Sequence, residues 1–169
     1  MRAHVREALQ DAGLSHSDLV PVRLTRYQAV LERVLETFTT FGVRGENRLW
    51  LWEGFKGSRV STPVEDGPSV MAQLLAPHDL VWLLLEDWEG TKKRGNYWVF
   101  EGEVQSVTAV LKHLFHVEYY VVDREFAWLL CENHHGVMTA VGRTMPERLQ
   151  AWVASPYSPA PLKPPAQGC

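Results

Sequence analysis

The stretch of residues 116–142 constrains the fold more than any other part of the chain, because it holds three short apolar segments separated only by short polar connections. Aromatic and β-branched residues dominate these segments, and such residues fit a pleated, half-buried surface. We expect strands at residues 119–122, 126–131 and 137–141. The connections between them are short, and the second contains Gly136, so the three strands should form an antiparallel meander.

The middle predicted strand is apolar on both faces, a pattern typical of a strand in the centre of a covered sheet. Alternation places Phe126, Trp128 and Leu130 on one face and the intervening residues on the other. The polar residues 132–135 should then mark the point at which the chain leaves the core and meets water.

Helical and strand periodicity extends over most of the remaining chain. We expect helices at residues 1–13, 25–41, 68–76, 103–115 and 144–154, and further strands at 48–55, 80–85 and 97–100. Thr25 and Thr144 are the predicted N-caps, the latter in a capping box with Glu147. Residues 56–67 contain two glycines and a proline and should be a loop. The order, roughly ααβαββαβββα, predicts an α+β fold with helices packed on a mainly antiparallel mixed sheet of about six strands.

Length and composition predict one globular domain, formed by residues 1–154. Residues 155–169 hold five of the ten prolines and should be a disordered or extended tail. The formal net charge of -3 does not favour nucleic-acid binding. We find neither a membrane-spanning apolar stretch nor a signal sequence, so we expect a cytoplasmic protein that does not bind membranes. An internal disulfide is not expected, because Cys131 lies in a predicted strand and Cys169 in the tail.

The candidate catalytic group lies at the end of the middle strand and directly after it, and it consists of Cys131, Glu132, His134 and His135. An imidazole near the thiol could take its proton and leave a nucleophilic thiolate. His134 and His135, with Glu132 or Cys131, could instead bind a metal ion. However, a cysteine between apolar residues is often simply buried, and adjacent side chains on a strand point apart. We therefore expect no catalytic residue, metal or cofactor, with an enzyme at these positions as the alternative.

Carboxylates near strand ends are a further candidate for acid or base chemistry. The set is Glu86, Asp87, Glu89, Glu101, Glu103 and Glu132. Two of its members could meet across the hairpin of residues 80–85 and 97–100 and share a proton. Strand ends are also where solvated charges ordinarily lie, so we expect most of this set at the surface.

Tryptophan is abundant, with seven in 169 residues. The predicted core members are Trp82, Trp98 and Trp128. Trp50 and Trp52 alternate with leucines in the predicted strand 48–55, and Trp88 lies in an acidic loop. Tryptophan is common at binding hot spots, so these three are candidate contacts for a partner. With the predicted hairpin tip, the expected binding residues are Trp50, Trp52, Trp88, Asn133, His134 and His135.

The distinctive pieces of the chain are Tyr119-Tyr120, Trp128-Leu129-Leu130-Cys131 and Asn133-His134-His135. Through these pieces, residues 80–142 resemble a family of small bacterial proteins classed as a domain of unknown function. In size, acidity and mixed architecture the chain is also similar to the SMI1/KNR4-like (SUKH) immunity proteins, which neutralise toxins by binding them. That second resemblance rests on no motif matched residue by residue, and it implies a binding role without locating it.

We therefore expect a non-enzymatic domain that binds another protein, with an immunity-type inhibitor of a toxin as one form of that role. The alternative is a small hydrolase or metal-dependent enzyme centred on residues 131–135.

Overall fold

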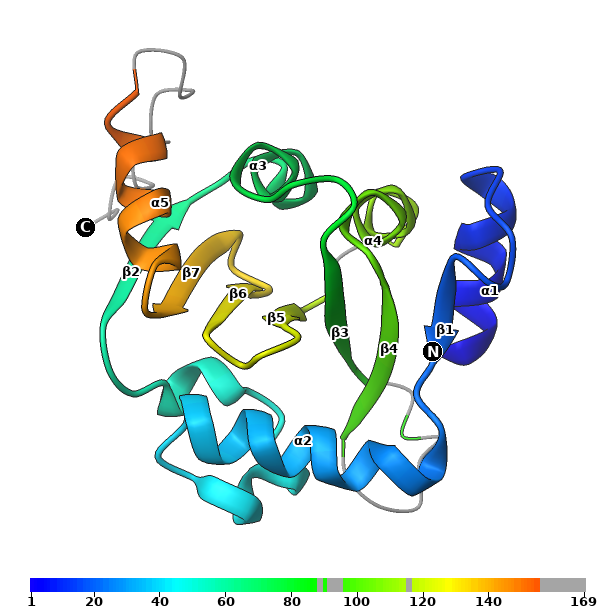
Figure 1. Ribbon diagram of the computed structural model, residues 1–169, viewed down its shortest axis with the longest axis horizontal. Helices are drawn as coiled ribbons and strands as arrows, with labels where there is room; N and C mark the ends of the chain where they lie inside the picture. The colour runs from blue at the N-terminus through cyan, green and yellow to red at the C-terminus, as the bar shows by residue number, and fades with distance from the viewer. Residues whose placement is uncertain (88–89, 91–95, 115–116, 156–169) are drawn as a thin grey trace, which may run out of the picture.

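The chain folds around one sheet of seven strands in the order β1-β4-β3-β5-β6-β7-β2 (Figure 1). Every pair of neighbouring strands is antiparallel. The strands are β1 (Leu19–Pro21), β2 (Arg59–Pro63), β3 (Leu80–Glu86), β4 (Tyr97–Glu103), β5 (Tyr119–Asp123), β6 (Trp128–Glu132) and β7 (Val137–Gly142). The computed structural model describes residues 1–87, 90, 96–114 and 117–155.

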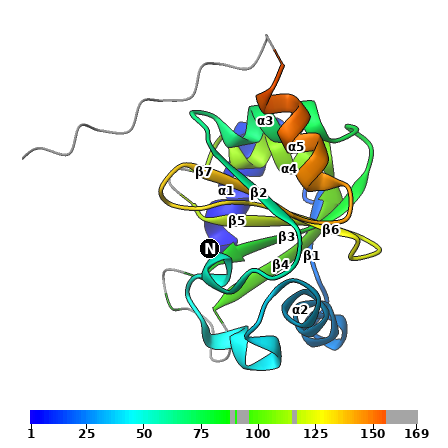
Figure 2. The ribbon, with the colours of Figure 1, turned by 90° about the vertical axis from the view of Figure 1, so that its left-hand side faces the viewer.

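Helices cover both faces of this sheet (Figure 2). They are α1 (Arg2–Asp11), α2 (Leu24–Phe38), α3 (Gly67–Leu74), α4 (Val104–Leu111), α5 (Met145–Val153) and the short 3-10 helices η1 (Gly42–Asn47) and η2 (Leu51–Gly54). Apolar residues of α1, α3, α4 and α5 pack against one face, while those of α2 and η2 pack against the other. The expected α+β class and the mainly antiparallel sheet are confirmed.

Alternation along the central strands separates two cores, one on each face of the sheet. In β6, Leu130 packs on the side of α3 and α4, whereas Leu129 and Cys131 pack on the side of α2. In β3, Leu83 and Leu84 divide between the two cores in the same way. Both faces of β6 are therefore covered, as its continuous apolar sequence predicts.

Helix α2 provides most of the helical cover on its face. Its buried residues follow three- and four-residue spacing and form one stripe, Val30, Leu31, Val34, Leu35 and Phe38. The helix begins with Arg23 at the N-cap, so the prediction of Thr25 as the cap is wrong. Thr144 does occupy the N-cap of α5, but its side chain makes no capping hydrogen bond, and the predicted capping box is absent.

Three predictions of local structure are wrong. Residues 48–55 contain the 3-10 helix η2 and no strand. Residues 56–67 contain β2, which pairs with β7 along the edge of the sheet, where Pro63 is tolerated. Phe126 lies before β6, in a turn where its φ is 56°. It therefore packs on the side of α2 and not, as predicted, on the same face as Trp128 and Leu130. The two strands that the sequence does not predict, β1 and β2, are the two edges of the sheet.

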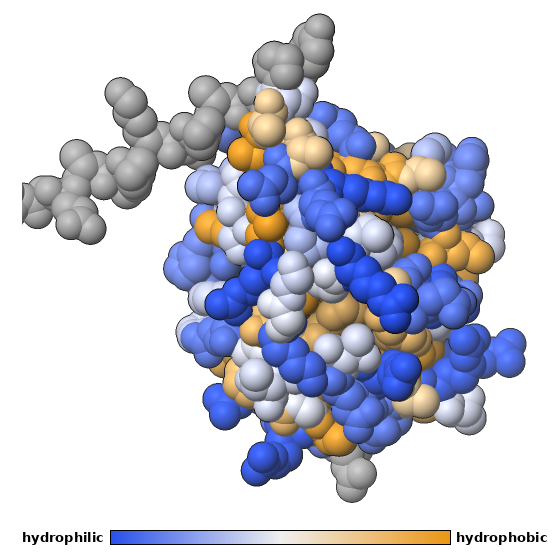
Figure 3. All heavy atoms as spheres, turned by 60° about the vertical axis from the view of Figure 1, so that its left-hand side comes forward, coloured by the Kyte–Doolittle hydropathy of each residue, from blue (hydrophilic) through white to orange (hydrophobic). Residues whose placement is uncertain are grey.

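The surface beside β2 and α5 is mainly hydrophilic, with hydrophobic residues in separate patches (Figure 3). Among the predicted core tryptophans, Trp82 is buried, and Trp98 and Trp128 pack half-buried against the core. Across the described ranges, no helix has the length and apolar character to cross a membrane. The predicted tail lies outside the described residues from residue 156 onward, which includes Cys169.

Candidate functional site

One end of the sheet collects both acidic and aromatic side chains, at the point where β3 and β6 end and β4 and β5 begin. Strand register places Glu86 opposite Tyr97. It also places Tyr119 opposite Glu132. Because side chains alternate, Tyr119 faces α3 and α4, whereas Tyr97 and Tyr120 face α2. This end of the sheet therefore carries two polar groups, one on each face.

Glu118, directly before β5, is the central residue of the group on the α2 face. Its side chain is only 1% exposed. The carboxylate accepts hydrogen bonds from the Tyr120 hydroxyl, from Nε1 of Trp52 at 2.9 Å and from Nδ1 of His134 at 3.1 Å. The His134 side chain is 37% exposed, so part of its ring faces solvent. A buried carboxylate with three donors is well satisfied, and it fixes the positions of all three rings.

Two buried tyrosines hold the backbone on either side of Trp50. The Tyr97 hydroxyl donates to the carbonyl oxygen of Leu49 at 2.6 Å. The N–H of Leu51 donates to the Tyr120 hydroxyl at 3.0 Å. Leu51 is fully buried, whereas Trp50 is 40% exposed. The indole of Trp50 is thus presented to solvent on a backbone fixed at both neighbouring residues.

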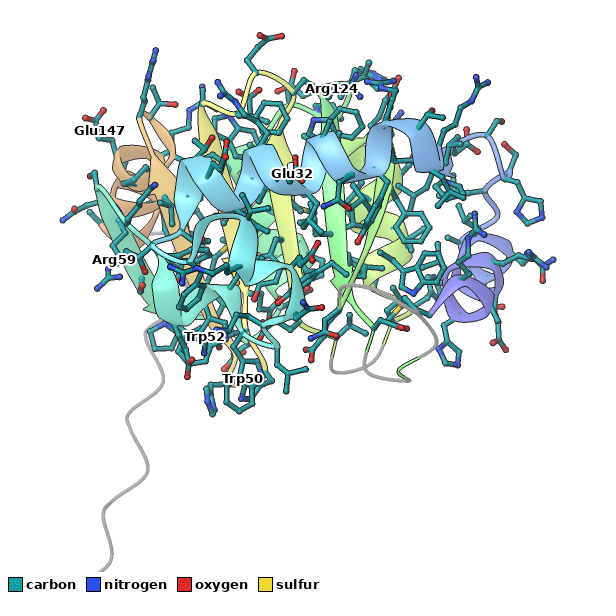
Figure 4. All side chains as sticks on the ribbon, turned by 90° about the horizontal axis from the view of Figure 1, so that it is seen from below. Glu32, Trp50, Trp52, Arg59, Arg124 and Glu147 are labelled. Carbon is teal, nitrogen blue, oxygen red and sulfur yellow. The ribbon has the colours of Figure 1, made fainter. Side chains whose placement is uncertain are left out.

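Four rings form a surface that we call the aromatic patch, and they are Trp50, Trp52, His134 and His135. The ring centroids of His134 and His135 are 4.0 Å apart, and those of Trp50 and His134 are 5.4 Å apart. The rings of Trp52 and His135 meet edge to face at 6.0 Å. Figure 4 shows Trp50 and Trp52 side by side at one edge of the α2 face, with Arg124 at the opposite edge. The structure therefore brings together four of the predicted binding residues.

Negative charge predominates behind the aromatic patch. Burial raises the pKa of Glu86, and the Glu118 carboxylate raises it further, while His134 acts in the opposite direction. Burial also raises the pKa of Tyr97 and Tyr120, so both hydroxyls stay protonated at neutral pH. Two carboxyl groups therefore lie near one imidazole, an arrangement that an additional cation would stabilise.

The polar group on the opposite face consists of Glu132 and Tyr119, beside the first residue of α3. The N–H of Gly67 donates to the Glu132 carboxylate, and burial raises the pKa of this carboxyl group. A Cβ atom at Gly67 would overlap the Glu132 carboxylate, so only glycine allows this close approach. The Tyr119 hydroxyl is buried against the Glu132 carboxylate, and among the described residues this contact falls short of a well-aligned hydrogen bond.

The surroundings of Cys131 and Asn133 indicate that both residues support the fold. Cys131 is fully buried, and burial raises the pKa of its thiol, which is therefore a poor nucleophile. The Oδ1 atom of buried Asn133 accepts hydrogen bonds from the N–H groups of His135 and Val137, so this side chain shapes the turn. Cys131 and Glu132 face opposite sides of the sheet.

The structure does not gather the predicted ligands into a metal site. Within the described ranges, no group of three or more His, Cys, Asp or Glu side chains could hold a metal ion. His134 and His135 do contact each other, but the Nδ1 atom of His134 is bonded to Glu118. Trp88 and Glu89, predicted as a binding residue and a strand-end carboxylate, lie outside the described residues.

Glu118, the residue around which the α2-face group is built, is not among the residues predicted from the sequence. Of the predicted carboxylates, Glu86 lies near Glu118, a residue outside its own hairpin. Asp87 accepts a hydrogen bond from Nε1 of Trp98. A signal for Glu118 does exist, because it stands two residues before Tyr120 and so falls on the same face once β5 is extended to it.

The fold and this site define an α+β domain with a two-faced polar end. Residues 1–152 match the family DUF6756, described as a family of unknown function, and the chain belongs to that family. The expected membership in a family of unknown function is confirmed, over a longer range than residues 80–142. No curated protein and no solved structure shows a significant match. The resemblance to SMI1/KNR4-like proteins is not confirmed by these comparisons.

Proposed function

We propose that this chain is a non-enzymatic protein-binding domain and that the aromatic patch is its contact surface. The observation that carries the proposal is the exposed indole of Trp50, held between two backbone hydrogen bonds to buried tyrosines. A rigid, exposed tryptophan loses little conformational entropy on binding, and tryptophan is enriched among residues that dominate binding energies.

The charge around the aromatic patch favours a partner that presents an arginine or lysine. The carboxyl groups of Glu86 and Glu118 lie near the patch, with the imidazole of His134 beside them. A guanidinium or ammonium group from the partner would be attracted by these carboxylates and could also stack on Trp50. Leu49, adjacent to Trp50, is 52% exposed and supplies an apolar contact next to this position.

An immunity-type inhibitor of a toxin is the specific form of this proposal, with the cytoplasm as the place of action. Inhibition of this kind requires only that the domain cover a functional surface of its partner. A basic toxin surface would match the acidic environment of the aromatic patch.

The test is affinity capture from a lysate of the cells that produce the protein, followed by measurement of Kd with the purified partner. Wild type is compared with Trp50→Ala, Glu86→Gln and the control Leu24→Ala, which removes a still more exposed apolar side chain at the start of α2. We expect Trp50→Ala to weaken binding about 30-fold, as for a hot-spot residue. Glu86→Gln should weaken it less, and Leu24→Ala should leave it unchanged. Unchanged binding in Trp50→Ala, or no stoichiometric partner, would contradict the proposal.

A second candidate, acid or base catalysis, has one supporting observation. The buried Glu118 carboxylate is bonded to a partly exposed imidazole, an arrangement that orients a histidine for proton transfer. It replaces the alternative in which Cys131 acts as a nucleophile. In a screen of ester and phosphoester substrates, any activity must fall in both Glu118→Gln and His134→Gln for this candidate to stand.

A further inference from the structure

A pocket of about 520 Å3 lies on the face of the sheet that α3 and α4 cover, and it reaches His134 of the aromatic patch at one side. We call it the α3 pocket, because it opens beside the first residues of α3. Its apolar wall is formed by Val64, Pro68, Leu111, Leu114 and Val117. Its polar end is formed by Tyr119 and Glu132, with Asn133 and His134 beside them. The pocket therefore combines an apolar wall with polar groups that can orient a ligand.

The polar end of the α3 pocket is incompletely satisfied. The Tyr119 hydroxyl is buried against the Glu132 carboxylate, and within the part of the chain that the structure describes this contact falls short of a well-aligned hydrogen bond. The Glu132 carboxylate interacts with the Tyr119 hydroxyl and with the Gly67 N–H, which leaves further acceptor capacity on its two oxygens. Burial of a hydroxyl without a well-made hydrogen bond costs free energy. A ligand that forms a good hydrogen bond with it removes this cost, and the difference contributes to the binding free energy.

The charges around the α3 pocket distinguish among possible ligands. Asp66 caps α3 by accepting hydrogen bonds from the N–H and the hydroxyl of Ser69, so its carboxylate is already engaged. Glu132 is the half-buried carboxylate, while Glu65 and Lys112 are exposed at the rim. An anionic ligand would be repelled by Glu132, and an uncharged one would leave the charge of this carboxylate poorly compensated.

We propose that the α3 pocket binds a primary amine carried on a short apolar chain. The ammonium group has three donors and no acceptor, which suits the oxygen atoms of Glu132 and Tyr119. The apolar chain lies against the wall of valine, proline and leucine side chains. The pocket meets the aromatic patch at His134, but its polar end lies on the other face of the sheet, and the proposal does not depend on the function proposed for the patch.

Calorimetric titration with n-pentylamine hydrochloride tests the proposal, with 1-pentanol as the neutral analogue of the same length. For a ligand of this size we expect a Kd near about 1 mM for the amine in wild type. Glu132→Gln should weaken binding about tenfold or more, because it removes a charge-assisted hydrogen bond. Tyr119→Phe should weaken it about threefold to tenfold. The matched control Glu65→Gln, which removes a carboxylate at the exposed rim, should bind as wild type does.

Three results would overturn the proposal. They are no heat of binding up to about 10 mM amine in wild type, equal affinity for pentanol and pentylamine, and unchanged affinity in the variants of the polar end. If Glu132→Gln does not fold, Tyr119→Phe decides the outcome, because it keeps the ring and its packing. Retained wild-type affinity in Tyr119→Phe would then exclude the site.

Discussion

At one end of the sheet, each face carries a glutamate beside a tyrosine, but the two pairs differ in how completely they are hydrogen-bonded. On the α2 face, Glu118 and Tyr120 are buried, and three donors satisfy the carboxylate. On the opposite face, Glu132 and Tyr119 lie side by side, but the tyrosine hydroxyl lacks a good hydrogen bond. A carboxylate that is saturated, meaning that protein donors use its acceptor positions, holds other side chains in place. A carboxylate with fewer donors can still accept hydrogen bonds from a ligand.

The largest effect should come from removal of the saturated carboxylate. Glu118→Ala leaves Tyr120, Trp52 and His134 without their shared acceptor. We expect the free energy of unfolding to fall by about 3–5 kcal/mol, as for the loss of one member of a buried charged pair. Urea denaturation at neutral pH measures this change. The exposed Glu53→Ala should remain within about 0.5 kcal/mol of wild type, and an equal loss in both variants would contradict the framework role.

Removal of one hydroxyl from each face tests the comparison directly. Tyr120→Phe loses a hydrogen bond to Glu118 and one from Leu51, and should lower the free energy of unfolding by about 1.5–3 kcal/mol. Tyr119→Phe removes a hydroxyl without a good partner and should be neutral within about 0.5 kcal/mol or stabilising. The two variants are matched controls for each other, since each removes one atom from a buried ring in β5. Equal losses would show that both hydroxyls are satisfied.

The close approach of Glu132 to α3 can be broken at Gly67. A Cβ atom there would overlap the Glu132 carboxylate, so Gly67→Ala should lower the free energy of unfolding by about 1–3 kcal/mol. In the double variant Gly67→Ala/Glu132→Ala the overlap with the carboxylate is absent and only the close approach to the Tyr119 hydroxyl at 2.7 Å remains, so part of this loss should be recovered. Additive losses in the double-mutant cycle, measured by chemical denaturation, would mean that the two residues are not coupled.

The smallest expected effect is a pH dependence at Glu86 on the α2 face. Its pKa is raised above the ordinary value of 4.5, chiefly by burial and then by Glu118. The folded state therefore binds the proton more tightly than the unfolded state, and the stability contributed below pH 4.5 is lost as pH rises through the raised pKa. Glu86→Gln should gain stability relative to wild type as pH increases from about 4 to about 7. A stability difference that stays constant or falls over this range in urea titrations would contradict the assignment.

Sequence periodicity predicts the centre of this fold better than its edges. The strands β3, β5, β6 and β7 consist mainly of apolar residues on both faces. Their sequences therefore predict strands that are buried in the centre of the sheet. The edge strands β1 and β2 lack such a pattern, because an edge strand takes its conformation from its single neighbour. The same limit explains η2, where alternation of Trp50 and Trp52 with leucines indicates a strand that does not form.

For the candidate site, the sequence identifies the rings but not the carboxylate that organises them. Trp50, Trp52, His134 and His135 are predictable because tryptophans near polar turns and a histidine pair stand out locally. The role of Glu118 depends on Trp52, 66 positions earlier in the chain, and on His134, 16 positions later. Such partners are chosen by packing, and no local pattern reports them.

The sequence by itself determined the α+β class, the central strands and the helices that cover them, because local periodicity encodes which side chains are removed from water. Only the tertiary structure decided that Trp50 is exposed, that Glu118 is saturated and that Tyr119 is not. These outcomes depend on hydrogen bonds between distant segments, such as those from Leu51 to Tyr120 and from Tyr97 to Leu49, which span 69 and 48 positions. Their geometry exists only after the two layers of helices have closed on the sheet.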